Sequence, residues 1–152
     1  MTTDQQASWQ LIHFNDLTPV QLYNILRLRS EVFVVEQNCV YLDLDGKDNE
    51  CFHLFAEQDN KTIACSRIVP PGLSYSEPSI GRIATAGEAR GTGYGKELVQ
   101  RSIDATLQLY GETAIKIGAQ LYLKKFYESF GFAQVSDIYD EDGIDHIKML
   151  RS

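Results

Sequence analysis

The sequence predicts an α/β fold in which a mixed sheet carries helices on its faces. Two observations support this prediction: short apolar runs of strand-like composition alternate with longer runs of helical period, and turn or capping residues separate them. In order, the segments read strand, helix, three strands, helix, strand, helix and two strands. The 152 residues contain no repeat, linker or low-complexity tract, so we expect a single domain spanning residues 1–152.

The first strand and the first helix are predicted near the N-terminus. Residues 9–14 alternate loosely in polarity, as expected of a short strand. Thr18 can cap a helix that has Pro19 at its first position, and Gln21 completes a capping box. The helix is expected to run to about residue 34, because apolar residues follow its period: Leu22, Ile25, Leu26, Val32 and Phe33.

The middle of the chain predicts a hairpin and a further strand. Residues 51–57 and 62–69 have strand composition and flank a short polar turn, so we expect them to pair. Residues 79–85 form another apolar strand, which runs into a glycine-rich turn. A long amphipathic helix is expected after this turn, since apolar residues recur at intervals of four and three: Val99, Ile103, Leu107 and Tyr110.

The last third predicts a strand, a helix and a second hairpin. Residues 114–119 form a compact strand. Residues 120–130 carry apolar side chains on one side of a helix, which Gly131 is suited to end. Two further strands flank an Asp-Gly turn at residues 142–143.

Composition is typical of a globular protein, with 43% hydrophobic and 23% charged residues. No apolar run approaches the roughly 20 residues of a membrane span, so no membrane partner is expected. The N-terminal residues lack the basic and apolar regions of a secretory signal. The three cysteines, Cys39, Cys51 and Cys65, form no Cys-x-x-Cys pair. We therefore expect a cytoplasmic protein whose cysteines are free packing residues.

The net charge of −7 argues against a nucleic-acid partner. Residues 31–59 hold eight acids and one base, a balance of −7, so the excess lies in one segment and favours a cationic amine as partner. Within it, residues 43–50 place only two acids before Gly46, whereas a calcium loop needs three alternating ligands. We expect a solvated acidic loop and no metal, and we expect Arg67 and Arg82, which lie in apolar strands, to pair with acids.

The turn after residues 79–85 has the properties of a phosphate site. Gly91, Gly93 and Gly95 let the backbone direct several N–H groups to one point at a helix N-terminus, with Arg90 and Lys96 nearby. A P-loop is excluded because its first glycine and its Ser/Thr are missing, and the dinucleotide pattern lacks its third glycine. From spacing alone, a plain glycine-rich turn stays an equal alternative.

Two motifs decide between these alternatives by resemblance. Arg90-x-x-Gly93-x-Gly95 is similar to the acyl-CoA pyrophosphate loop of the GCN5-related N-acetyltransferase (GNAT) superfamily. Tyr127-x-x-x-Gly131-Phe132 resembles the helix and strand behind the thiol end of the cofactor in that superfamily. The segments 32–39, 80–82, 118–120 and 140–147 narrow the resemblance to its ElaA-like branch.

The resemblance implies a mostly antiparallel, twisted sheet of six to seven strands, splayed where acyl-CoA binds. It places the backbone of Ile83, Ala84 and Thr85 along the pantetheine arm, with Arg90 at the start of the phosphate loop. Gln120 stands where relatives often have asparagine, which leaves its role in cofactor binding open. The amides expected to hold the pyrophosphate belong to Gly91, Thr92, Gly93, Tyr94, Gly95 and Lys96.

Acyl transfer to an amine needs a base, an oxyanion donor and an acid for the leaving thiolate. Tyr127 suits the acid role, although spacing alone also fits a packed aromatic residue. A backbone amide near Ala84 is the oxyanion donor that the resemblance implies. The residues 79–85 contain no Glu or His, so the base is sought elsewhere, in the order Glu36, His146, His53, with ordinary structural roles as the alternative for each.

The sequence thus predicts an acetyl-CoA-dependent N-acetyltransferase that acts by direct transfer in a ternary complex. The resemblance implies acetyl-CoA as co-substrate and a small-molecule or peptide amine as acceptor, and a homodimer is common in this fold. Two alternatives stay open: a non-catalytic acyl-CoA-binding module and a transferase of a longer acyl group.

Overall fold

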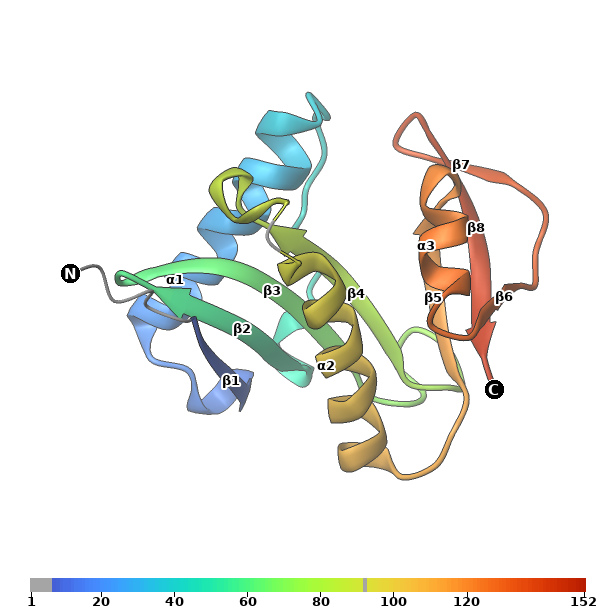
Figure 1. Cartoon of the computed structure of the whole chain (residues 1–152), viewed down its shortest axis with the longest axis horizontal. Coiled ribbons are helices and arrows are strands. Elements are labelled where there is room, and N and C mark those ends of the chain that lie inside the picture. The colour runs from blue at the N-terminus through green and yellow to red at the C-terminus, as the bar shows by residue number, and fades with distance from the viewer. Residues whose placement is uncertain (1–6, 92) are drawn as a thin grey trace.

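The computed structural model describes residues 7–91 and 93–152. Its strands and helices follow the predicted order, with one strand more near the C-terminus (Figure 1). The strands are β1 (Ser8–His13), β2 (Phe52–Gln58), β3 (Lys61–Val69), β4 (Ser79–Thr85), β5 (Ile115–Gln120), β6 (Phe132–Gln134), β7 (Tyr139–Glu141) and β8 (Ile144–Arg151). The α-helices are α1 (Pro19–Arg29), α2 (Tyr94–Tyr110) and α3 (Lys124–Glu128).

The first sheet contains β1, β2, β3 and β4 in that order, and all three pairs are antiparallel. The predicted hairpin is confirmed: Asp59 and Asn60 join β2 to β3, and both have the positive φ of a tight hairpin turn. The capping box is confirmed as well. Thr18 Oγ1 accepts from the Gln21 amide at 3.1 Å, and Gln21 Oε1 accepts from the Thr18 amide at 2.9 Å.

The first helix changes type before its predicted end near residue 34. Its α-helical part ends at Arg29, and the chain continues as a π-helix, η2 (Ser30–Glu36). Two backbone bonds of the π type extend to Gln37 and Cys39, whose amides donate to residues five positions earlier. A π-helix is wider than an α-helix and is often found at functional sites. Here it turns Val32, Phe33 and Glu36 toward β4.

The second sheet is built on β8, which pairs antiparallel with β5, β6 and β7. The Asp142-Gly143 turn is confirmed by positive φ at both residues. The predicted α/β fold is therefore confirmed, and residues 7–91 and 93–152 form eight strands in two four-stranded sheets instead of six to seven in one. The count differs because residues 132–134 and 139–141 pair with different parts of the long β8.

Each sheet packs against helices through an apolar core of its own. One core lies between α1, the first sheet and one side of α2, and includes Ile25, Phe55, Ile68 and Leu98. The other lies between the second sheet, α3 and the other side of α2, and includes Ile103, Ile117, Tyr127 and Met149. Helix α2 therefore stands between the two sheets (Figure 1).

Strands β4 and β5 run side by side in the same direction but separate along their length (Figure 1). They start together, where the Lys116 amide donates to the Pro78 carbonyl at 3.1 Å, and they belong to different sheets. The free edge of β4 therefore faces β5 across a gap, near the N-terminus of α2.

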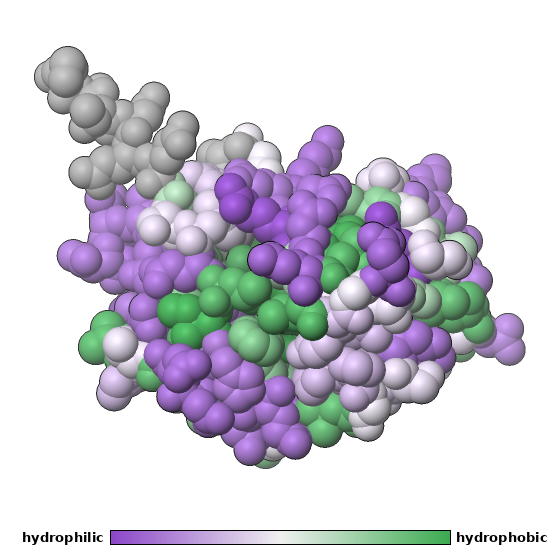
Figure 2. Space-filling model, turned by 90° about the horizontal axis from the view of Figure 1, so that it is seen from below, coloured by the Kyte–Doolittle hydropathy of each residue, from purple (hydrophilic) through white to green (hydrophobic). Residues whose placement is uncertain are grey.

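The surface is mixed in character. Figure 2 shows apolar side chains gathered in the middle of one face, with hydrophilic ones around them. Within the described residues, no helix has the length and apolar character needed to cross a membrane.

Candidate active site

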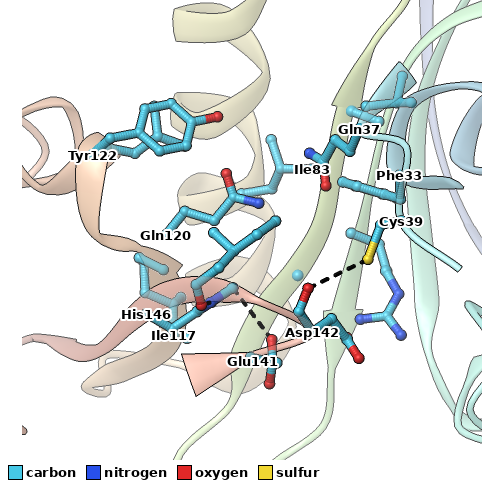
Figure 3. A pocket seen from close by; sticks show the side chains of 18 of the residues that line it. Phe33, Gln37, Cys39, Ile83, Ile117, Gln120, Tyr122, Glu141, Asp142 and His146 are labelled. Atoms are coloured by element: carbon cyan, nitrogen blue, oxygen red, sulfur yellow. Dashed lines mark hydrogen bonds and ion pairs between the residues drawn. The ribbon is translucent and has the colours of Figure 1, made fainter. Parts of the chain in front are cut away.

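A cavity of about 530 Å³ fills the gap between β4 and β5 (Figure 3). Its walls come from η2, β4, β5, α3 and the β7–β8 hairpin. At one end it reaches Thr85 and Arg90, next to the glycine turn, and at the other it reaches Glu141 and His146. The cavity therefore extends from the predicted phosphate loop to the β7–β8 hairpin.

The free edge of β4 supplies backbone groups to this cavity. The Ala86 amide donates to the Ile63 carbonyl on β3 at 2.8 Å. Because neighbouring residues of an antiparallel strand alternate in direction, Ala84 also turns its amide toward β3. The Ile83 carbonyl and the Thr85 amide and carbonyl then point into the gap. The oxyanion donor expected near Ala84 is thus better sought at the Thr85 amide, one residue further along the strand.

A bulge shapes the same strand. Arg82 and Ile83 stand opposite the single residue Ser66 of β3, and Arg82 has φ 49°. A bulge of this kind bends the strand and re-aims its edge groups. Both bulge residues, Arg82 and Ile83, line the cavity.

The glycine turn has the predicted backbone geometry. Gly91 and Gly93 have φ 79° and 87°, values that a residue with a side chain adopts only with strain. Gly93 caps α2 without a side-chain bond, so its own position leaves the first amides of this helix available to an anion. The Tyr94 ring packs against the first core, so only the backbone amide of this residue can bind the anion. Lys96 is exposed on the first turn, and Thr92 lies outside the described residues.

The Arg90 side chain interacts with two residues that line the cavity. Its guanidinium pairs with Glu36 of η2 and also donates to the Thr85 carbonyl at 2.9 Å. Both side chains of the pair are a little under half exposed. The structure thus brings together a predicted cofactor residue and the first-ranked base candidate, and it leaves Glu36 as the partner of a permanent cation.

Tyr127 and Gln120 line the middle of the cavity. Tyr127 projects from α3 with 7% of its surface exposed, and its hydroxyl has no hydrogen-bond partner among the described residues. Burial, and to a lesser extent the nearby Tyr122, raises the pKa of Tyr127 to about 12. The phenol therefore stays protonated at neutral pH and can donate a hydrogen bond into the cavity.

The two histidine candidates occupy different places. His146 lies in the cavity wall, with Nδ1 2.8 Å from the Ile144 carbonyl and Nε2 3.3 Å from Glu141 Oε2 (Figure 3). His53 is 1% exposed and does not line the cavity. Its Nε2 lies 3.0 Å from the Asp48 carbonyl, and burial lowers its pKa. His53 therefore serves the packing of the first sheet, whereas His146 faces the site.

Comparison with known proteins identifies the family of the chain. A family model described as "Acetyltransferase (GNAT) domain" matches residues 15–152 of the chain. The chain belongs to the GNAT acetyltransferase family. It is 42% identical over 146 residues to a UPF0039 protein of Synechocystis sp., covering 95% of each chain.

Solved structures of GNAT relatives superpose closely on this one. An acyl-CoA N-acyltransferase from Pseudomonas aeruginosa has a TM-score of 0.93 at 38% identity, covering 97% of this chain and 100% of that one. Escherichia coli ElaA has a TM-score of 0.90 at 36% identity, with the same coverage. The ElaA-like resemblance is thereby confirmed. Membership of this family supports acyl-CoA N-acyltransferase activity, with acyl-CoA as co-substrate.

The expectation of a solvated acidic loop is wrong. Asp43 and Asp48 are buried, and with Asp45 they surround three arginines of the sheet and first helix. Arg29 lies 2.8 Å from Asp43 and 2.7 Å from Asp48. The predicted pairing of Arg67 and Arg82 with acids is confirmed. Asp43 and Asp48 can be buried because each has guanidinium partners, which the sequence of the loop alone could not reveal.

Sequence reasoning also missed parts of the cavity wall. Cys39, interpreted as a packing residue, lines the cavity, and its thiol lies 3.6 Å from the Asp142 carbonyl across the opening (Figure 3). Glu141 was not singled out. The Asp-Gly turn fixes the register of the hairpin, so Glu141 lies diagonally across from His146. This contact could therefore have been predicted from the sequence.

Proposed function

We propose that this GNAT protein transfers an acetyl group from acetyl-CoA to a primary amine, by direct attack in a ternary complex. The observation that carries the proposal is the continuity of a single cavity. It joins the phosphate-binding turn at Arg90, the free backbone edge of β4 and the Tyr127 phenol. A pyrophosphate at the α2 N-terminus and an acyl group near Tyr127 can therefore belong to one extended ligand.

In this proposal each part of the site has a separate task. The amides at the start of α2 hold the pyrophosphate, and the β4 edge at Ile83 and Thr85 accepts and donates hydrogen bonds along the pantetheine arm. The amine attacks the thioester carbonyl, whose developing oxyanion receives a backbone N–H from the same edge. As the carbon–sulfur bond breaks, Tyr127 gives its proton to the departing thiolate.

The far end of the cavity is the proposed acceptor site. It is lined by Tyr41, Arg82, Glu141, Asp142 and His146. The two carboxylates there favour an amine that carries positive charge, either a small molecule or an exposed peptide amine. The net charge of −7 in residues 31–59 attracts a cationic amine less strongly than its size suggests. The reason is that arginines neutralise Asp43, Asp45 and Asp48.

The proposal is tested first by binding. Calorimetry with acetyl-CoA should give a single site, and no binding at millimolar ligand would refute the assignment. Release of free CoA is then followed with a panel of amines and peptides. Acetyl-, propionyl- and succinyl-CoA are compared, so that a longer acyl group or binding without turnover would each be recognised.

The role of Tyr127 is tested by Tyr127→Phe, which removes only the hydroxyl. We expect kcat to fall about 100-fold or more while acetyl-CoA affinity is kept, because the lost group acts on the leaving thiolate. Tyr23→Phe is the matched control, since Tyr23 is exposed on α1 and outside the cavity. Unchanged kcat in Tyr127→Phe would remove the acid role.

A further inference from the structure

The β7–β8 hairpin places a carboxylate and an imidazole together at the acceptor end of the cavity. Glu141 Oε2 lies 3.3 Å from His146 Nε2, and both residues line the cavity (Figure 3). The His146 side chain is 9% exposed, whereas that of Glu141 is 57% exposed. The imidazole is therefore fixed in the wall, and the carboxylate reaches both the imidazole and the open cavity.

The surroundings of His146 determine which nitrogen can accept a proton. Nδ1 lies 2.8 Å from the Ile144 carbonyl, and because a carbonyl only accepts, Nδ1 carries the hydrogen. Nε2 then turns its lone pair toward the Glu141 carboxylate. The two atoms can share one proton between them, and the pair acts as a proton acceptor when that proton is absent.

The ring is held in this orientation from behind. Tyr139 lies against it with ring centroids 5.8 Å apart. The Tyr139 hydroxyl in turn stands over Gly118, where a Cβ atom would approach it to 3.1 Å. The Lys148 ammonium lies 4.7 Å from the Tyr139 ring centre and fixes its other side. Gly118 therefore provides the space that lets Tyr139 support the imidazole.

The other basic groups of the described cavity wall are less well placed. Glu36, another carboxylate of the wall, is already paired with Arg90. Besides Glu141 and Tyr139, the titratable and charged side chains around His146 that line the cavity are Cys39, Tyr41, Arg82 and Asp142. Asp142 is exposed at the tip of the turn.

We propose that His146 and Glu141 together form the base of the reaction, an inference that rests on the proposed function. The cationic amine first releases one proton to solvent; as the neutral amine attacks, the pair takes its second proton and holds it between Nε2 and Oε2. The nitrogen lone pair forms the new bond to the thioester carbon, the carbon–sulfur bond breaks, and the thiolate takes a proton from Tyr127. The amine thus loses a proton to one side of the cavity and the sulfur gains one from the other.

The test compares three variants with the wild type, using acetyl-CoA and the best amine of the panel. Glu141→Gln and His146→Gln each disable the pair, and Glu141→Gln changes an exposed side chain that folding does not need. Asp145→Asn is the matched control. It removes the same charge one residue from His146, on an exposed side chain outside the cavity.

We expect both pair variants to keep the wild-type affinity for acetyl-CoA and to lose about 100-fold in kcat/KM. Asp145→Asn should keep the wild-type kcat/KM, because its side chain lies outside the cavity. Wild-type kcat/KM in both pair variants would overturn the inference. Absence of CoA release by the wild type with every amine would instead refute the proposed function, and the base with it.

Discussion

Arg29 is the residue whose removal should affect the fold most strongly. Its side chain is 1% exposed, lies 2.8 Å from Asp43 and 2.7 Å from Asp48, and closes the loop that carries Tyr41 to the cavity. Arg29→Met keeps a long side chain but removes the charge. Two carboxylates, at 4% and 9% side-chain exposure, then lose this partner.

Breaking a buried ion pair by removing one partner costs about 3–5 kcal/mol of unfolding free energy. For a domain of this size, each kcal/mol lowers the melting midpoint by roughly 2–4 °C. We therefore expect Arg29→Met to lower the midpoint by about 6–20 °C in a calorimetric or circular-dichroism melt. The Asp48 carboxylate keeps Arg67 at 3.1 Å, which favours the lower part of this range.

Arg27→Met is the control, two residues earlier on the same helix. Arg27 pairs with Glu31 one turn along, and both side chains are more than half exposed. Such a pair contributes about 0.3–0.5 kcal/mol, equivalent to about 1–2 °C. Equal melting midpoints for the two variants would refute the view that the buried arginine cluster stabilises this loop.

Three further predictions concern the same features. Glu36→Gln should tighten acetyl-CoA binding about 1.4- to 5-fold in calorimetry, because the half-exposed pair with its arginine partner, worth about 0.2–1 kcal/mol, no longer competes with the ligand; equal or weaker binding would contradict this. Gly93→Ala should cost about 1–2 kcal/mol in urea unfolding and weaken acetyl-CoA binding, since φ is 87° there, whereas Gly87→Ala, at a negative φ, should do neither. Burial alone would raise the pKa of Asp45 and Asp48, but hydrogen bonds from arginine side chains outweigh it and hold both values below the ordinary range. Their contribution to stability is thus complete above the unfolded pKa of about 3.9 and is lost as the pH falls below it, so urea unfolding should give a smaller free energy at pH 3 than at pH 7.

Much of the fold could be predicted because its signals are local. The capping box at Thr18, the turns at Asp59 and Asp142 and the stop at Gly131 each depend on residues within a few positions. Backbone preferences decide such features before any long-range contact forms. The change of helix type after residue 29 was not predicted, since neither propensity nor period shows that an α-helix will widen into a π-helix.

The phosphate turn and Tyr127 were also accessible from the sequence, because each belongs to a motif with fixed spacing. What they form together was not, since the cavity exists only because β4 and β5 separate beyond their first hydrogen bond. The acidic loop shows the same limit. Asp43 and Asp48 lie 14 and 19 positions from their partner Arg29, so only the folded structure could show that they are buried and paired.

The sequence by itself determined the order of the elements, the glycine geometry before α2 and the family to which the chain belongs. Tertiary structure alone decided that Glu36 meets Arg90, that His146 and Glu141 line the same end of the cavity, and that His53 lies outside it. The physical reason is that short-range backbone preferences are written in neighbouring residues. The protonation and pairing of a side chain depend instead on which distant charges the fold brings within about 4 Å.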